Sequence, residues 1–338
     1  MGKEEKAREL HASSIIIDGL VISRWTEDFF VRLRQGGLTA INATLATHDE
    51  GFREVTRRFA RWYQMFEEYH SLIMPVTRVE DIRRAKELGK TGIIFGFQDT
   101  TPIEDELDYL SIYHRLGVRV IQLTYMEANY VGDGCLEKRN GGLTSFGFEV
   151  IEELNRLGIL IDLSHVGYKT TMEAIEASKM PVAFTHANPK GLCDHPRNKT
   201  DEQIKAVAAK GGVIGANIFP LFLAGGSKST MKDLIDVVDY MANLVGIDRI
   251  GIGTDFTEGQ PIEFFEYLLK GKSKKGPTFE LEYPIVFPEG IRSISEFPNI
   301  TKALAERGYT EPDVKKVMGE NFLRLFGKVW EKNETEIR

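Results

Sequence analysis

The chain has 338 residues, of which 42% are hydrophobic and 28% are charged, an ordinary globular composition that allows a large buried core. A net charge of −7, with Lys and Arg scattered among Asp and Glu, argues against binding to nucleic acid or to an anionic membrane surface. Two cysteines, Cys135 and Cys193, are too few for a disulfide framework, and the charged first segment lacks the apolar core of a signal peptide. No apolar run approaches the ~20 residues of a membrane helix. We therefore expect a cytoplasmic protein.

Short apolar, β-branched runs bounded by glycine or polar residues predict eight strands. They lie at Ser14–Asp18, Leu38–Leu45, Gly92–Phe97, Val118–Tyr125, Ile159–His165, Pro181–His186, Gly212–Ile218 and Ile250–Asp255. Amphipathic helices between them, such as Gly147–Leu157 and Thr170–Ser178, indicate a parallel sheet. Nearly continuous apolar strands and the absence of a GxGxxG motif after the first one favour a closed barrel over an open sheet. We predict an α/β fold, a single (β/α)₈ TIM barrel over residues 1–338 with an N-terminal helix and a C-terminal helical tail.

Two segments after the last predicted strand are expected to have distinct roles. Lys270–Pro288 is loop-like, and it could be either a lid over the barrel mouth or a solvated insertion. Glu311–Trp330 predicts one helix, because Pro312 suits a first turn. Its apolar stripe consists of Val314, Val317, Phe322 and Phe326.

Polar residues that end apolar runs are candidates for chemistry, because barrels place their active sites at the carboxyl ends of their strands. Four positions fit: Gln98, His165, His186 and Asp255. Two imidazoles and a carboxylate are typical Zn²⁺ ligands, and they would leave a position for a water whose pKa the ion lowers to about 7. The same side chains could instead make structural hydrogen bonds only.

Other polar residues give weaker signals. His48 follows the second predicted strand and could reach the barrel mouth. Arg197 carries a planar guanidinium that suits a carboxylate, with a structural ion pair as the alternative, and we assign it and Asn198 to substrate binding. No GxSxG motif is present, and nothing local marks Cys135 or Cys193 as a reactive thiol.

Four stretches together resemble one known family. They are GGLTSFGFEVIEELNRLGILIDLSHVG, PVAFTHANPKGLCDHPRNKTDEQIKAVAAKGGVIGANIF, IGIGTDFTEG and GENFLRLF. They are similar to the membrane (renal) dipeptidase family of zinc peptidases, over residues 12–328. The resemblance implies a (β/α)₈ barrel, usually a homodimer, in which two zinc ions bridged by a glutamate serve the hydrolysis of dipeptides.

The resemblance also implies roles for individual residues. By position, His165 and His186 resemble the two histidines of one zinc ion. Arg197 resembles the arginine that holds the substrate carboxylate, and Asp255 the aspartate that ligates or orients at the other zinc and handles protons. Tyr125 stands where the family has a histidine that contacts substrate.

Three ligands of the family pattern are missing. Leu20 and Ile22 replace the His and Asp of the first-strand His-x-Asp motif, and the neutral amide of Gln98 replaces the bridging glutamate. A second dication beside two apolar side chains, without anionic ligands, would be too costly. We therefore predict at most one zinc ion, weakly bound or even absent, with ligands drawn from His165, His186, Asp255 and Gln98.

The leading hypothesis is a dipeptidase-like, metal-dependent hydrolase that cleaves an amide bond in a small dipeptide or acyl-amino acid with a carboxylate. Asp255 and His165 would be catalytic, and Arg197, Tyr125 and Asn198 would bind substrate. The apolar replacements favour an aromatic or acyl-bearing substrate. Two alternatives remain: a barrel that binds a small carboxylate without turnover, and a metal-free enzyme in which Asp255 and His165 form an acid–base pair.

Overall fold

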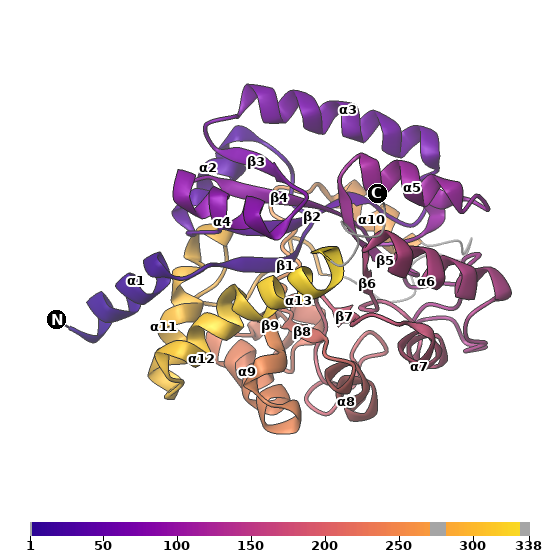
Figure 1. Cartoon of the computed structure of the whole chain (residues 1–338). Helices are drawn as coiled ribbons and strands as arrows, with labels where there is room; N and C mark the ends of the chain where they lie inside the picture. The colour runs from indigo at the N-terminus through magenta and orange to yellow at the C-terminus, as the bar shows by residue number, and fades with distance from the viewer. Residues whose placement is uncertain (1, 271–281, 332–338) are drawn as a thin grey trace.

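A computed structural model of the chain describes residues 2–270 and 282–331, and in it eight parallel strands close into a ring (Figure 1). The strands are β1 (Ile17–Val21), β2 (Ala40–Ala46), β4 (Thr91–Phe97), β5 (Val118–Gln122), β6 (Leu160–Asp162), β7 (Ala183–Phe184), β8 (Val213–Ala216) and β9 (Ile250–Ile252). Their order is β2-β1-β9-β8-β7-β6-β5-β4, and the parallel pairing of β2 with β4 closes the ring. The predicted (β/α)₈ barrel is confirmed.

Helices surround the barrel (Figure 1). They are α1 (Lys3–Ser13), α2 (Glu27–Gln35), α3 (Phe52–Glu68), α4 (Val79–Leu88), α5 (Asp108–Arg115), α6 (Ser145–Leu157), α7 (Tyr168–Ala177), α8 (Asp201–Ala209), α9 (Met231–Val245) and α11 (Pro298–Arg307). In α6, Thr144 caps the first turn by accepting from Gly147 N, and Gly158 ends the helix at φ 69°. Its buried stripe includes Val150 and Leu154, as the periodicity predicts.

A ninth strand, β3 (Ile73–Val76), was not predicted. It pairs with the first half of β4, from Ile73 opposite Thr91 to Val76 opposite Ile94, while β5 pairs with the last three residues of β4. The segment is only four residues long and contains Pro75, which lacks an N–H and weakens the strand signal. β3 therefore lies at the edge of β4 and adds no strand to the ring.

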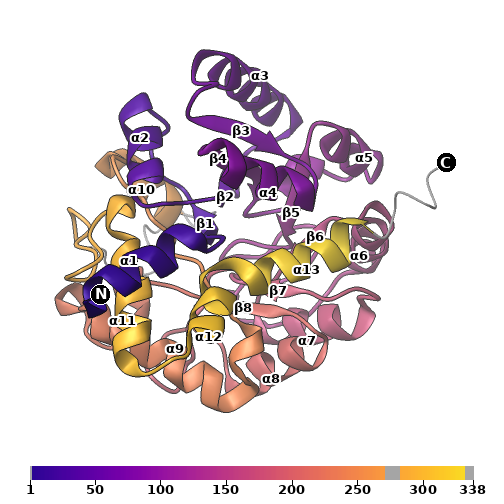
Figure 2. The same ribbon diagram turned by 60° about the vertical axis from the view of Figure 1, so that its left-hand side comes forward.

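The C-terminal tail closes the amino-terminal end of the barrel (Figure 2). The predicted single helix is divided into α12 (Glu311–Lys315), a π-helical turn (Lys316–Glu320) and α13 (Asn321–Trp330). The break lies at Gly319, where a Cβ atom would stand 2.3 Å from the carbonyl oxygen of Ile15. Glycine therefore lets the chain pack against the start of β1, so that Phe322 reaches the barrel core.

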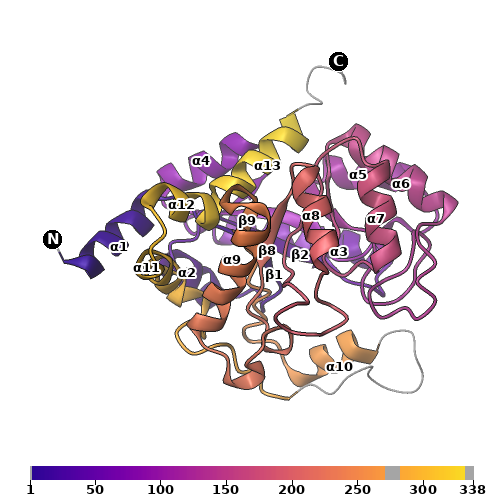
Figure 3. The same ribbon diagram turned by 90° about the horizontal axis from the view of Figure 1, so that it is seen from below.

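Helix α10 (Ile262–Lys270) lies at the opposite end of the barrel from α13 (Figure 3). It places Phe265 and Leu268 over the carboxyl ends of the strands. Most of the loop-like segment Lys270–Pro288, for which a lid and a solvated insertion were the two interpretations, falls in residues 271–281 and lies outside the described residues. Within the described ranges, no helix combines the length and the apolar character that a bilayer crossing requires.

Candidate active site

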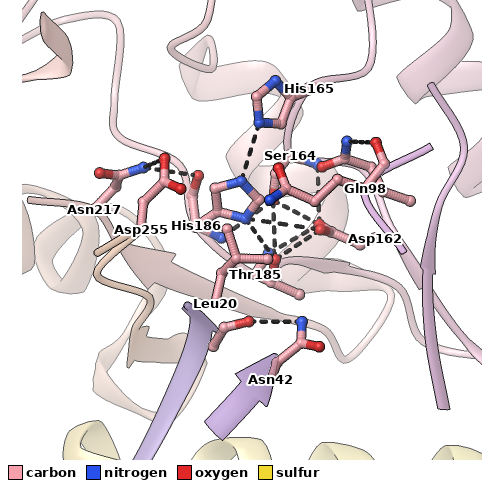
Figure 4. A network of polar contacts seen from close by, with 12 residues as sticks. Leu20, Asn42, Gln98, Asp162, Ser164, His165, Thr185, His186, Asn217 and Asp255 are labelled. Carbon is pink, nitrogen blue, oxygen red and sulfur yellow. Dashed lines mark hydrogen bonds and ion pairs between the residues drawn. The ribbon is translucent and has the colours of Figure 1, made fainter. Parts of the chain in front are cut away.

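Two histidines converge at the carboxyl end of the barrel (Figure 4). His165 lies three residues beyond β6 and His186 lies two residues beyond β7. Both side chains are buried, and their Nε2 atoms are 3.1 Å apart. Two imidazole nitrogens bound at 2.0–2.1 Å to one tetrahedral zinc would lie roughly 3.3 Å apart. The pair therefore has the separation that two ligands of one ion need.

Asp162, the last residue of β6, fixes the orientation of His186. Its carboxylate accepts hydrogen bonds from the backbone and hydroxyl of Ser164, at 3.0 and 2.6 Å, and from those of Thr185, at 3.0 and 2.7 Å. The Thr185 hydroxyl lies 2.7 Å from Nδ1 of His186, and Oδ2 of Asp162 lies 3.8 Å from the same atom. Oxygen partners on Nδ1 leave Nε2 as the nitrogen directed at His165.

The two histidines are kept neutral by their surroundings. Burial lowers the pKa of both imidazoles well below its usual value, and the positive charge of Arg197 lowers each pKa further. Nδ1 of His165 is buried and has no hydrogen-bond partner among the described residues. Neutral imidazole is the form that binds metals, so the electrostatics suit ligation as well as the geometry does.

Asp255 follows β9 but is not directed at the histidine pair. Its Oδ2 accepts a hydrogen bond from Nδ2 of Asn217 at 3.3 Å, and its backbone N–H donates to Leu20 O at 3.0 Å. The backbone φ is +60°, a strained value for a non-glycine residue that is often found at functional sites. Burial raises the pKa of the carboxyl to about 6.

The described part of the chain contains no group of three or more His, Cys, Asp and Glu residues that could hold a metal, so the predicted three-ligand set is not assembled there.

A small cavity of about 40 Å³ lies beside these residues, under α10. Its lining brings together predicted site residues from distant strands, namely Gln98, Tyr125, His165 and Asp255. Gln98 donates from Nε2 to the Thr44 hydroxyl at 2.9 Å. Ile22 lines the same cavity, and Leu20, two residues earlier, is buried. Apolar side chains therefore occupy both positions at which the family has the His and Asp of the His-x-Asp motif.

Five aromatic and imidazole rings form a continuous series across the barrel mouth. In order they are Tyr267, His48, Tyr125, His165 and His186. Successive ring centroids are 5.1, 5.1, 4.3 and 5.1 Å apart. His48 thus reaches the mouth, as the sequence allowed, and it contacts the site through the ring of Tyr125.

Arg197 and Asn198 lie behind the cavity and do not line it. The Arg197 guanidinium is buried, donates to His186 O at 2.8 Å and to Ser164 O, and packs on the Phe222 ring at 5.4 Å. Asn198 donates from Nδ2 to Cys193 O and Phe222 O, at 2.9 and 3.1 Å. These two hydrogen bonds hold the backbone next to His165 and at His186 in place. Among the described residues, Arg197 forms no ion pair with a carboxylate.

Sequence comparison identifies the family. The family model for membrane dipeptidases, peptidase family M19, matches residues 5–267 and 283–337. The chain belongs to the membrane dipeptidase family. The resemblance expected from the sequence is thereby confirmed.

Two curated relatives of this chain are longer than it is. An uncharacterised dipeptidase, C965.12, of Schizosaccharomyces pombe is 30% identical over 253 residues, which are 73% of this chain and 54% of that protein. Dipeptidase tcpJ of Claviceps purpurea is 26% identical over 287 residues, which are 84% of this chain and 62% of that one. The chain therefore spans less than two thirds of the length of these two relatives.

Two solved structures are similar to this chain over almost its whole length. An amidohydrolase from Pseudomonas aeruginosa is 45% identical, with a TM-score of 0.94 and coverage of 96% of this chain and 99% of that one. A metallo peptidase from Rhodobacter sphaeroides, liganded with a phosphinate mimic of the dipeptide L-Ala-D-Ala, is 19% identical, with a TM-score of 0.80 and coverage of 94% and 100%. The second likeness shows the fold alone.

Proposed function

We propose that this member of the membrane dipeptidase family hydrolyses the amide bond of a small dipeptide or N-acyl amino acid with the help of one metal ion. The observation that carries the proposal is the pairing of His165 and His186, whose Nε2 atoms are 3.1 Å apart at the carboxyl end of the barrel. Similarity to dipeptidase tcpJ of Claviceps purpurea supports a dipeptide-like substrate.

His165 and His186 would hold the ion, which we propose to be zinc, and Asp255 or Gln98 could complete the ligand set only by turning toward them. When bound, the ion supplies a water of lowered pKa as the nucleophile. A second ion finds no ligands at Leu20 and Ile22, whose side chains are buried and apolar. The histidine pair and the apolar side chains at the first-strand positions support the proposal of one ion rather than two.

Asp255 is the best candidate for moving protons. Its carboxyl lines the cavity with His165, and burial raises its pKa to about 6, close to the value at which a group can accept and return a proton near neutral pH. It would take a proton from the attacking water and deliver it to the nitrogen of the leaving amine. Tyr125, in the same cavity, would contact the substrate.

Arg197 would support the site by donating to the backbone carbonyls of Ser164 and His186, next to and within the histidine pair. Its proposed contact with the substrate carboxylate stays a prediction, as does that of Asn198. We also propose a cytoplasmic homodimer. The thiols of Cys135 and Cys193 are free in the structure, which suits a reducing compartment.

The test is metal-dependent turnover. Protein stripped with a chelator should not release amino acid from alanyl-alanine or N-benzoylglycine, and added Zn²⁺ should restore release. Asp255→Asn should lower kcat by about 100-fold or more, because general base catalysis typically contributes 10²–10⁴. Asp194→Asn, at an exposed loop position, is the matched control. Saturable binding of both compounds with no turnover would replace the proposal with the carboxylate-binding alternative, and turnover indifferent to chelation would favour metal-free acid–base chemistry.

A further inference from the structure

A second cavity adjoins the candidate active site and is much larger, about 380 Å³. It is lined by residues of the β1–α2 loop, of β2 and the residue after it, of α3, and of α10 and the loop that precedes it. The lining residues are Ile22, Ser23, Arg24, Trp25, Thr44, Thr47, Arg58, Arg61, Trp62, Met65, Gln260, Phe264 and Tyr267. We call it the arginine-lined cavity. Ile22 lines both this cavity and the one that contains His165, so the two meet at that side chain.

The sizes of the two cavities indicate how a ligand would divide between them. The cavity beside His165 holds about 40 Å³, enough for a reacting group and little more. An apolar cavity of about 150 Å³ accommodates a benzene ring, so 380 Å³ accepts a ring with a charged substituent and water. A substrate whose amide reaches the histidines would therefore place its bulk beyond Ile22.

The charged residues that line the arginine-lined cavity are all positive. Arg24, Arg58 and Arg61 line it, and no Asp or Glu among the described residues does. Arg58 is paired with Glu50, whose carboxylate also accepts from Thr47 N at 2.9 Å. Arg24 and Arg61 are exposed, and neither has an ion pair within the described ranges. Two guanidinium groups therefore remain available for an anion, and their planar donor sets favour a carboxylate.

The other walls of this cavity are aromatic and apolar. The rings of Trp25 and Trp62 lie 4.9 Å apart at an angle of 57°, and Phe264, Tyr267 and Met65 complete the apolar lining. Tyr267 also stacks on His48 at 5.1 Å, which joins this wall to the ring series that ends at the histidine pair. Aromatic surfaces next to guanidinium groups suit a flat apolar body with an anionic end.

We propose that the arginine-lined cavity binds the acyl side of the substrate, and that this part is an aromatic or other apolar group bearing its own carboxylate. The proposal rests on the proposed function for the position of the scissile amide. Arg24 and Arg61 bind the distal carboxylate, and Trp25 and Trp62 contact the apolar body. The substrate therefore has one carboxylate on each side of the amide.

A pair of isosteric substrates tests the proposal. N-(4-carboxybenzoyl)glycine and N-(4-carbamoylbenzoyl)glycine have the same shape and differ in the distal charge. We expect the wild-type protein to prefer the carboxylate by about tenfold or more in kcat/KM, and the Arg24→Gln, Arg61→Gln double variant to bring the ratio close to one. Arg53→Gln, on the same helix α3 but outside the lining, should keep the wild-type ratio. Equal kcat/KM values in the wild type, or an unchanged ratio in the double variant, would overturn the proposal.

Tryptophan fluorescence distinguishes two outcomes: that the cavity does not bind the acyl group, and that the protein is not a hydrolase. Two of the three tryptophans, Trp25 and Trp62, line the cavity, and Trp330 lies on α13 at the other end of the barrel. If neither compound is hydrolysed, the hydrolase proposal fails. Binding to the cavity would still be supported if N-(4-carboxybenzoyl)glycine quenches the fluorescence saturably in the wild type and in Arg53→Gln but not in the double variant. Absence of saturable quenching in the wild type would overturn the cavity assignment.

Discussion

The ring of Tyr125 stacks on the ring of His165, with centroids 4.3 Å apart and planes inclined by 21°. His48 also stacks on Tyr125, with ring centroids 5.1 Å apart. Tyr125 is almost fully buried, and burial raises the pKa of its phenol, so the hydroxyl stays protonated. Tyr125 thus supports one member of the histidine pair with its ring and offers a neutral donor to the cavity.

Two substitutions of Tyr125 separate these contributions. Tyr125→Phe keeps the ring, so we expect thermal stability and metal content to stay at the wild-type level while kcat/KM falls through loss of the hydroxyl. Tyr125→Ala removes the ring between two imidazoles and should lower the free energy of unfolding by about 3–5 kcal/mol, as other buried aromatic-to-alanine changes do. Urea denaturation and steady-state kinetics measure both effects. Equal stability of the two variants would show that the stacked ring does not support the site.

Asp162 is expected to act on metal affinity through His186. Asp162→Asn keeps the side-chain volume but removes the charge beside Nδ1 and places an amide N–H₂ among the donors of Ser164 and Thr185. We predict that zinc binds about 10–100-fold more weakly, the usual effect of losing such a supporting carboxylate. Competition with a chromophoric chelator measures the dissociation constant. An affinity equal to that of the wild type would mean that Thr185 alone orients the imidazole.

Asp18 should make stability depend on pH. Its buried carboxyl accepts from Thr254 N at 2.8 Å, and burial raises its pKa to about 7. The ordinary value in an unfolded chain is about 3.9, so between these two values the folded protein holds a proton that the unfolded chain has released. The contribution of Asp18 to stability is thus full below about pH 4 and is lost as the pH rises to about 7.

Asp18→Asn should remove this dependence. Relative to the wild type, the variant should gain stability as the pH rises from about 4 to about 7, by a few kcal/mol, because each pKa unit corresponds to about 1.4 kcal/mol. Above pH 7 the difference should level off. Urea denaturation at pH 4.5, 6.0 and 7.5 provides the measurement, and unfolding free energies that run parallel for the two proteins would show that Asp18 titrates normally in the fold.

Phe322 provides a stability test remote from the site. It is fully buried at the amino-terminal end of the barrel, against Gly19 and Gly251. Phe322→Ala should lower the free energy of unfolding by about 3–5 kcal/mol, while kcat/KM of the folded enzyme stays near the wild-type value. A loss of activity in folded protein, measured well below the melting temperature, would contradict a purely structural role for α13.

Much of the fold could be predicted because each strand of the barrel can be recognised from its local sequence. Strands buried on both faces are nearly continuous apolar runs, and all eight were found. β3 was missed because Pro75 and its short length hide it, and its strand state depends on pairing with β4. The helix break at Gly319 follows from contact with Ile15, which is far away in the sequence and invisible to local periodicity.

Residues of the candidate site could be predicted only where their position relative to the end of a strand determines their location in the barrel. His165, His186 and Asp255 lie within three residues of the ends of parallel strands, so their presence at one end of the barrel follows from the topology. Asp162 and Tyr267 were missed because their roles depend on pairing between strands and on how α10 packs. The one local signal for Asp162 was its position two residues before Ser164, a spacing typical of an Asx turn.

The metal content of the protein tests the central claim most directly. Elemental analysis of protein saturated with zinc and then dialysed should give about one ion per chain. The His165→Ala, His186→Ala double variant should give none, and His70→Ala, at an exposed position in the sequence after α3, should match the wild type. No zinc in the wild type, or zinc retained by the double variant, would contradict a single ion held by His165 and His186.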